Sequence, residues 1–252
     1  MKKVDSGIDR RTLLVAGGGL VGSAALIAGA ATTAFGEEAP SASGSAPDFG
    51  GLIPVAFVMG PGATMIDFAG PWEVFQDAQD DHQGFYLYTV SDSTDEIATT
   101  GNFLNGKGSG LRFRPDYAFA NAPQPKVIMM GAQGGHTPAK IAWLRKASVE
   151  ADFVFSNCTG AFLLAKTGLL DGLSATTHHD FFESFEKEFP KVKLVRDARY
   201  VDNGKFITSG GLTSGIDGAL HIVERILGRE MAEKTIAYME YSGQGWKTRA
   251  RA

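Results

Sequence analysis

The sequence predicts an α/β fold in which a mostly parallel sheet lies between helices on both of its faces. Short apolar runs typical of buried strands alternate along the chain with longer stretches of helical periodicity. Glycine-rich turns follow several of these runs, as the loops of such a sheet require. The 252-residue chain, less a separate N-terminal segment, suits one compact domain of roughly 200 residues. We therefore expect a single domain over residues 51–252.

The first 35 residues are typical of an export signal. A basic start is followed by the charge-free, Gly/Ala-rich stretch 13–31 and by the small residues 32–34. The run from Arg10 to Leu14 resembles a twin-arginine signal. We expect export by that route and cleavage, which would leave the domain periplasmic or secreted and without stable membrane association. An uncleaved anchor is the alternative, because the stretch approaches the roughly 20 residues that span a bilayer.

Residues 36–50 are rich in Ser, Gly, Ala and Pro and predict a flexible linker. The first half of the domain then predicts strands over 52–59, 85–90 and 126–130. Turns and short hairpin strands are expected over 95–115, and a helix over 138–149. We expect Pro71 to open the first helix, at a position where its missing N–H costs nothing.

The second half continues the alternation, with a hairpin turn at Asn203–Gly204. Strands are expected over 151–156, 192–195, 200–202 and 205–208. Helices are expected over 161–170, 180–189, 216–227 and 230–241. The third of these helices is amphipathic, with apolar residues at helical spacing.

Cys158 is the residue that most suggests chemistry. It follows a predicted strand and precedes a predicted helix, at the sheet edge where ligands bind in such folds. The N-terminus of a helix lowers the pKa of a thiol, and Gly160 permits close approach of the backbone. A small buried core cysteine is the other interpretation, and position alone leaves both open.

Two further turns are expected at the same edge. The backbone N–H groups of the glycine-rich turn 131–135 could form an anion hole together with that of Thr159, although the turn could also be merely tight. Asp67 follows the first strand in an apolar segment, where a partly desolvated carboxylate could titrate near neutral pH. It could equally be a helix N-cap near Pro71, and Glu73 is the competing carboxylate.

The five histidines are weaker candidates. His178 and His179 are adjacent, so in a strand they would point to opposite faces and at most one would face the site. His136 follows the glycine turn, His82 lies in a polar loop, and His221 lies on the amphipathic helix.

Several function classes are disfavoured. The net charge of −4 and the lack of a basic cluster argue against nucleic acid as the main partner. One cysteine allows no internal disulfide and no zinc-type His/Cys spacing. No phosphate-binding loop is present, and the Gly17–Gly19 run lies in the leader with no strand before it.

Five segments carry a family resemblance: Asp67–Phe75 (DFAGPWEVF), Asn157–Ala165 (NCTGAFLLA), Gly168–Gly172 (GLLDG), Ala175–His178 (ATTH) and Thr208–Asp217 (TSGGLTSGID). Together they resemble the ThiJ/PfpI superfamily, which implies a flavodoxin-like three-layer sandwich with a nucleophile elbow. The resemblance runs from about residue 53 to residue 246. It is greatest to the isonitrile hydratase group and to the amidotransferase-like domains of AraC-type regulators. Few residues follow Trp246, so we expect no DNA-binding module.

The resemblance implies a site in which Cys158 is the nucleophile and Asp67 the acid/base carboxylate. Thr159 would help to position a small-molecule substrate. We further assign Gly131, Ala132, Gly134 and His178 to oxyanion or substrate binding. The implied reaction is addition of water to an isonitrile, giving an N-substituted formamide, with no metal or organic cofactor. A homodimer is also implied.

Two departures from the family pattern are visible. Thr159 stands where the peptidase branch carries a histidine, which weakens a protease function, and His179 stands where close relatives are expected to carry an aromatic residue. Alternatives to the hydratase are another cysteine-dependent activity of the superfamily, namely peptidase, amidase or glyoxalase-like. A non-catalytic ligand-binding or redox-sensing protein is the third possibility.

Overall fold

We describe the chain from a computed structural model, which describes residues 47–100, 110–248 and 250–251. The predicted signal peptide and most of the predicted linker lie outside the described residues, as do the turns expected around Gly101, Gly106 and Gly108. Among the described residues, no helix combines the length and apolar character that crossing a bilayer would require.

The described strands form one large sheet of eight strands in the order β12-β10-β11-β7-β6-β1-β2-β5. All its neighbouring pairs are parallel except β10 with β11, which confirms the mostly parallel sheet. The bounds of its strands are β1 Ile53–Val58, β2 Phe85–Ser91, β5 Tyr117–Ala118, β6 Val127–Met130, β7 Phe153–Asn157, β10 Tyr200–Asp202, β11 Phe206–Ser209 and β12 Ala250–Arg251. Two small pairs complete the set: β3 Ile97–Ala98 with β4 Arg112–Phe113, and β8 Ser174–Ala175 with β9 Lys193–Leu194.

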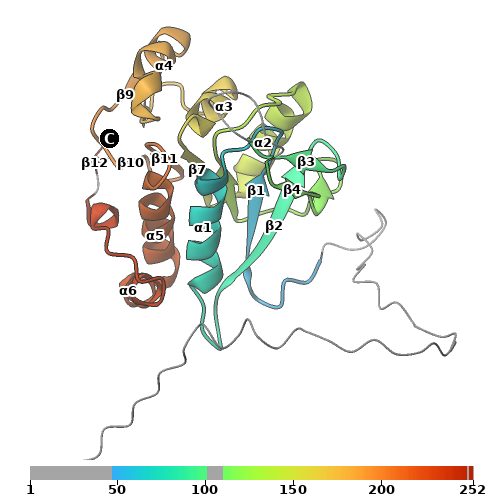
Figure 1. Ribbon diagram of the computed structural model, residues 1–252, viewed down its shortest axis with the longest axis vertical. Helices are drawn as coiled ribbons and strands as arrows, with labels where there is room; N and C mark the ends of the chain where they lie inside the picture. Colours follow the sequence, from blue (N-terminus) through green and yellow to red (C-terminus); the bar gives the residue numbers. More distant parts are fainter. Residues whose placement is uncertain (1–46, 101–109, 249, 252) are drawn as a thin grey trace, which may run out of the picture. The chain divides into compact units, whose positions relative to one another are not determined.

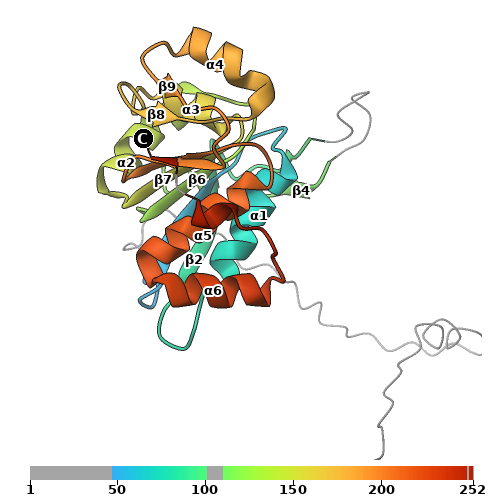
Figure 2. The same ribbon diagram turned by 90° about the vertical axis from the view of Figure 1, so that its left-hand side faces the viewer.

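Helices cover both faces of the large sheet, as predicted (Figures 1 and 2). One face carries α1 Met65–Asp77, α5 Ser214–Leu227 and α6 Arg229–Tyr238, and the other carries α2 Pro138–Glu150 and α3 Gly160–Lys166. The remaining helical segments are η2 His179–Phe181, α4 Phe182–Glu188 and η3 Gly245–Lys247.

Alternation along β1 shows why the sheet needs two helical layers. Val55 and Phe57 pack in the core beneath α1 and α5, whereas Ala56 and Val58 pack in the core beneath α2 and α3. All four side chains are fully buried, because successive residues of a strand point to opposite faces. The apolar run at 52–59 was therefore a reliable sign of a central parallel strand.

The first helix begins earlier than predicted. Its N-cap is Thr64 and Pro71 lies inside it, so the expectation that Pro71 opens the helix was wrong. A proline in that position deletes one backbone hydrogen bond, to the carbonyl of residue 67. The displaced start puts Asp67 in the first helical turn, so the N-cap interpretation of Asp67 was also wrong.

Other boundaries differ by smaller amounts. α3 ends at Lys166, before Gly168 takes a left-handed φ of 78°. The helix expected over 180–189 is divided into η2 and α4, and the last α-helix stops at Tyr238. β5, β8 and β12 were not predicted, since two-residue strands carry no detectable periodicity.

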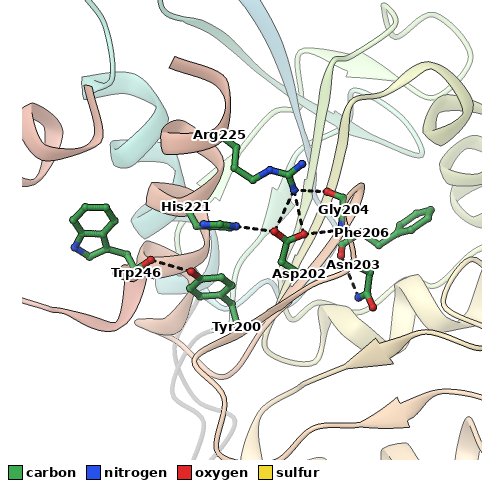
Figure 3. A network of polar contacts seen from close by, with 8 residues as sticks. All are labelled: Tyr200, Asp202, Asn203, Gly204, Phe206, His221, Arg225 and Trp246. Carbon is green, nitrogen blue, oxygen red and sulfur yellow. Dashed lines mark hydrogen bonds and ion pairs between the residues drawn. The ribbon is translucent and has the colours of Figure 1, made fainter. Parts of the chain in front are cut away.

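A buried polar network links β10 to α5 and to the C-terminal segment (Figure 3). His221 Nε2 lies 2.9 Å from Asp202 Oδ2, and Arg225 lies 3.1 Å from the other carboxylate oxygen. Tyr200 donates to the carbonyl of Trp246 over 2.9 Å and stacks on His221. His221, a weak site candidate from the sequence, therefore has a structural role, and the network ties α5 and the C-terminal segment to β10.

Candidate active site

Cys158 lies on a sharp turn between β7 and α3. Its φ of 58° is left-handed, a conformation that costs an L-residue about 1–2 kcal/mol. The turn is held on both sides of the residue: Cys158 N–H donates to the carbonyl of Gly210 over 2.7 Å, and its carbonyl accepts from Thr177 Oγ1 over 2.9 Å. The side chain is buried, with 6% of the residue exposed.

Gly160 allows α3 to start directly behind this turn. A Cβ on Gly160 would lie 2.6 Å from the Met130 carbonyl oxygen and 3.0 Å from that of Gly131. Any side chain there would push the helix away from β6, so the close approach predicted for this glycine is present.

The Asp67 side chain lies beside that of Cys158. Its carboxylate and the Cys158 thiol are hydrogen-bonding partners, although the two residues lie on α1 and after β7. The carboxylate also accepts from Ala132 N–H over 2.9 Å and is completely buried. Gly131 makes room for it, since a Cβ there would lie 2.7 Å from Asp67 Cβ.

Asn157 was not predicted as a site residue. Its side-chain amide donates to Asp67 Oδ1 over 3.1 Å and to the Leu212 carbonyl over 3.0 Å. Its own oxygen accepts from Ser209 Oγ over 2.9 Å. The sequence signal that could have identified Asn157 is an amide residue at the end of a hydrophobic strand, and in the structure this amide is wholly buried and fully hydrogen-bonded.

Leu212 was also missed. Its φ of 54° is left-handed, and its backbone N–H donates toward both the Asp67 carboxylate and the Cys158 sulfur. The residue as a whole is 42% exposed. Such strain at a non-glycine residue is typical of functional sites. Its position after Gly210 and Gly211 offered only a weak signal, because glycines alone also mark ordinary turns.

Burial sets the protonation of the pair. It raises the pKa of Asp67 to about 6, against hydrogen bonds from Ala132, Cys158 and Leu212 that lower it. Burial and then the charge of Asp67 raise the pKa of the Cys158 thiol to about 12, and the N–H groups of Thr159 and Leu212 oppose this only partly. The expectation that the helix N-terminus lowers this pKa was wrong: α3 is short, and desolvation beside a carboxylate outweighs it.

The glycine-rich turn directs two of its N–H groups to Asp67 and to the fold, so these two do not contribute to the predicted anion hole. Ala132 N–H is bonded to Asp67, and Gly134 N–H to the Pro61 carbonyl over 2.9 Å, so neither is free. The N–H groups directed at the sulfur are those of Thr159 and Leu212. Thr159 itself is half-buried and is the N-cap residue of α3.

A buried lysine supports this turn from beneath. Lys140 is fully buried, and its Nζ donates to Gln133 Oε1 over 3.2 Å and to the Gly134 carbonyl over 3.4 Å. Gln133 in turn donates to the Val58 carbonyl over 2.7 Å. Burial lowers the pKa of Lys140 to about 8, an effect that nearby Asp92 opposes.

The remaining candidates from the sequence, all among the described residues, differ in their burial and contacts, and none is shown to contact Asp67 or Cys158. His178 is half-buried against Gly211, the residue before Leu212, and His179 is exposed. His136 pairs with the Gln133 carbonyl, and burial followed by the charges of Lys166 and Lys140 lowers its pKa. The other two side chains, Glu73 and His82, are exposed and are not brought to the pair.

The DJ-1/PfpI family pattern matches residues 54–225, which include Asp67, Asn157, Cys158 and Leu212. The chain belongs to the DJ-1/PfpI family. It is 28% identical to the isonitrile hydratase of Pseudomonas putida over 198 residues, which are 75% of this chain and 79% of that enzyme. The DJ-1/PfpI membership agrees with the resemblance read from the five sequence segments.

Transcriptional regulators are also similar to this DJ-1/PfpI chain. The HTH-type regulator CdhR of Pseudomonas aeruginosa is 28% identical over 184 residues, 70% of this chain and 51% of the regulator. The HTH-type regulator GbdR of the same species is 30% identical over 127 residues, 49% of this chain and 34% of the regulator. The chain therefore spans between a third and a half of these regulators.

Solved structures of the DJ-1/PfpI family share the fold. A ThiJ/PfpI family protein from Pseudomonas syringae has a TM-score of 0.66 and 25% identity, covering 79% of this chain and 83% of that one. Drosophila melanogaster DJ-1beta has a TM-score of 0.62 and 19% identity, covering 76% and 99%. The flavodoxin-like α/β architecture is thereby confirmed.

Proposed function

We propose that the chain is a cysteine-dependent DJ-1/PfpI enzyme that adds water to an isonitrile and releases an N-substituted formamide. The observation that carries the proposal is the buried hydrogen-bonded pair of Asp67 and Cys158 on a strained turn. The isonitrile hydratase of Pseudomonas putida, similar over most of its length, supports the choice of substrate class.

In the resting site at neutral pH, the thiol carries the proton and Asp67 is ionised, because their pKa values are about 12 and about 6. The sulfur attacks the terminal carbon of the isonitrile while its proton moves to Asp67. The carbon then takes that proton from Asp67, and a thioimidate, R–N=CH–S–Cys158, results. The carboxylate thus acts first as general base and then as general acid.

Water completes the cycle. Ionised Asp67 accepts a proton from water as the water oxygen adds to the thioimidate carbon, and it passes that proton to the substrate nitrogen. The C–S bond then breaks as the new hydroxyl group becomes the carbonyl of the formamide R–NH–CHO, and the hydroxyl proton returns through Asp67 to the Cys158 sulfur. The N–H groups of Thr159 and Leu212, which face the sulfur, are placed to stabilise charge that develops there.

The test is turnover of cyclohexyl isonitrile by the purified protein, with the formamide followed by chromatography. The wild type should form formamide, whereas Cys158→Ala and Asp67→Asn should lose at least a thousandfold in kcat/KM. Folding of each variant is checked by circular dichroism. Lack of formamide from a folded wild type would reject the hydratase, and equal turnover by Cys158→Ala would reject the nucleophile.

A ligand-binding role without turnover is the second candidate, and the similarity to GbdR and CdhR favours it. It predicts that small ligands bind with unchanged affinity to Cys158→Ala and leave unaltered. Peptide, amide and glyoxal substrates, tested in parallel, would reveal any other cysteine-dependent activity.

We also propose that the chain is exported by the twin-arginine route and acts as a periplasmic or secreted homodimer. The Arg10–Arg11 start supports the route. N-terminal sequencing of exported protein should give a start near residue 36, and retention of Met1 would contradict cleavage. Light scattering of the purified protein tests the dimer.

A further inference from the structure

His178, His179 and Asp180 form a convergent cluster that the proposed reaction does not use. In a strand the two histidines would diverge, but η2 begins at His179 and turns the chain back. Their rings consequently stack, with centroids 4.5 Å apart and planes 26° apart. The expectation of opposite faces was therefore wrong, and the two imidazoles present nitrogen atoms to one carboxylate.

The three side chains bring their donor atoms together. His179 Nδ1 lies 3.0 Å from Asp180 Oδ1, and His178 Nδ1 lies 3.7 Å from Asp180 Oδ2. One ligand atom from each residue lies within 4.8 Å of the other two. Atoms bound at about 2.1 Å to one ion are at most about 4.2 Å apart, so only a small rotation separates this arrangement from coordination.

One side of the cluster is fixed and the other is open. The ring of His178 packs on Gly211, where a Cβ would lie 2.1 Å from His178 Cδ2. Asp180 N–H also donates to His178 Nδ1 over 3.2 Å, which orients the ring until an ion takes that nitrogen. The side chains of His179 and Asp180 are 74% and 67% exposed, so they are free to adjust around an ion and leave coordination positions to water.

We propose that His178, His179 and Asp180 bind a divalent transition-metal ion of the zinc class. Two imidazole nitrogens and one carboxylate oxygen are the borderline donor set that such ions prefer over calcium or magnesium. Three protein ligands leave at least one position for water or another small ligand. Binding gives up the hydrogen bond from Asp180 N–H to His178, so we expect micromolar affinity and not the tighter binding of a closed structural site.

The proposed ion would lie beside the segment that supports Cys158, without using its thiol. His178 follows Thr177, which donates to the Cys158 carbonyl, and contacts Gly211, which precedes Leu212. The metal site is independent of the proposed hydratase reaction, since none of its ligands belongs to the Asp67–Cys158 pair.

The test is isothermal titration of the tag-free full chain with zinc chloride in a non-chelating buffer. We expect one zinc ion per chain, a loss of affinity of at least tenfold in His179→Ala, and a smaller loss in Asp180→Asn. His82→Ala, which removes another exposed histidine, and Cys158→Ala should bind as the wild type does. Because His179 is exposed, His179→Ala should keep the wild-type melting temperature and circular dichroism spectrum.

A spectroscopic measurement identifies the ligands directly. Copper(II) bound at the same site should show electron-spin-echo modulation from two imidazoles in the wild type and from one in His179→Ala. No saturable zinc binding by the wild type, unchanged affinity in His179→Ala, or loss of binding in Cys158→Ala would each overturn the proposal.

Discussion

Asn157 Nδ2 donates to Asp67 Oδ1 over 3.1 Å, although the two residues are 90 positions apart in the chain. The residue immediately before Cys158 thereby orients the carboxylate that faces Cys158. This hydrogen bond connects strand β7 to helix α1, so two regular elements position the Asp67–Cys158 pair. Positioning of this kind keeps reacting groups near a productive geometry before substrate arrives.

Asn157→Asp tests this relationship with almost no change in shape. The variant replaces two donors by acceptors that face Asp67 and the Leu212 carbonyl, and it places two carboxyl groups together. We expect kcat/KM for the isonitrile to fall at least tenfold, which corresponds to about 1.4 kcal/mol. Ser209→Ala, which removes the hydrogen bonds from Ser209 Oγ to the Asn157 side-chain oxygen and to the Ser156 carbonyl, should cost less than threefold. If Asn157→Asp kept the wild-type kcat/KM, Asn157 would have no role in positioning Asp67.

The rate should depend on the ionisation of Asp67. A carboxylate must be ionised to accept the thiol proton, and burial raises the pKa of Asp67 to about 6. We expect kcat/KM to rise tenfold per pH unit below about 6 and to level off above it. A pH profile from 4.5 to 9 measures this limb. A profile that is flat across pH 6, with the protein folded throughout, is incompatible with Asp67 as the base.

The same raised pKa should be visible in stability. Because the pKa of Asp67 rises from 3.8 to about 6 on folding, its contribution is fully present below pH 3.8 and is lost as the pH rises through 6. Between pH 4 and pH 8, Asp67→Asn should therefore gain about 2 kcal/mol in the free energy of unfolding relative to wild type. Urea unfolding at the two pH values measures the difference, and exposed Asp81→Asn should show none.

Lys140 should influence Asp67 through the turn between them. Lys140→Met keeps most of the apolar part of the side chain but leaves Gln133 Oε1 and the Gly134 carbonyl without their donor. The hydrogen bond from Ala132 N–H lowers the pKa of Asp67, so a loosened turn that weakens this bond should raise that pKa. We expect the acidic limb of the rate profile to move to higher pH and kcat/KM at pH 6 to fall several-fold. Lys146→Met, an exposed lysine on the same helix, is the matched control. If the acidic limb of the rate profile stayed at the wild-type pH in Lys140→Met, Lys140 would contribute only to the stability of the fold.

The fold was predictable because its strands are long apolar runs. The runs that became β1 and β6 are buried on both faces, and burial on both faces produces continuous hydrophobic sequence. The first residue of α1 was not predictable from Pro71, since proline marks a helix start only as a statistical preference and tertiary packing holds this helix six residues further back. Cys158 and Asp67 were predicted as candidates from turns at the ends of strands.

Their surroundings depend on contacts between distant segments. Asn157 and Leu212 reach the pair only after β7, β11 and α5 are assembled, and a single sequence contains no record of those approaches. The direction of the thiol pKa was misjudged for the same reason: a helix terminus is visible in sequence, whereas the depth of burial and the nearness of a carboxylate are not.

A chain with one cysteine makes any thiol reagent a reporter on a single atom. Since Cys158 is 6% exposed and interacts with Asp67 and Leu212, a bulky maleimide can label it only when the segments around it move apart. The labelling rate of the unmodified protein therefore measures how often the thiol becomes accessible. Intact-mass spectrometry could follow this opening without any engineered label.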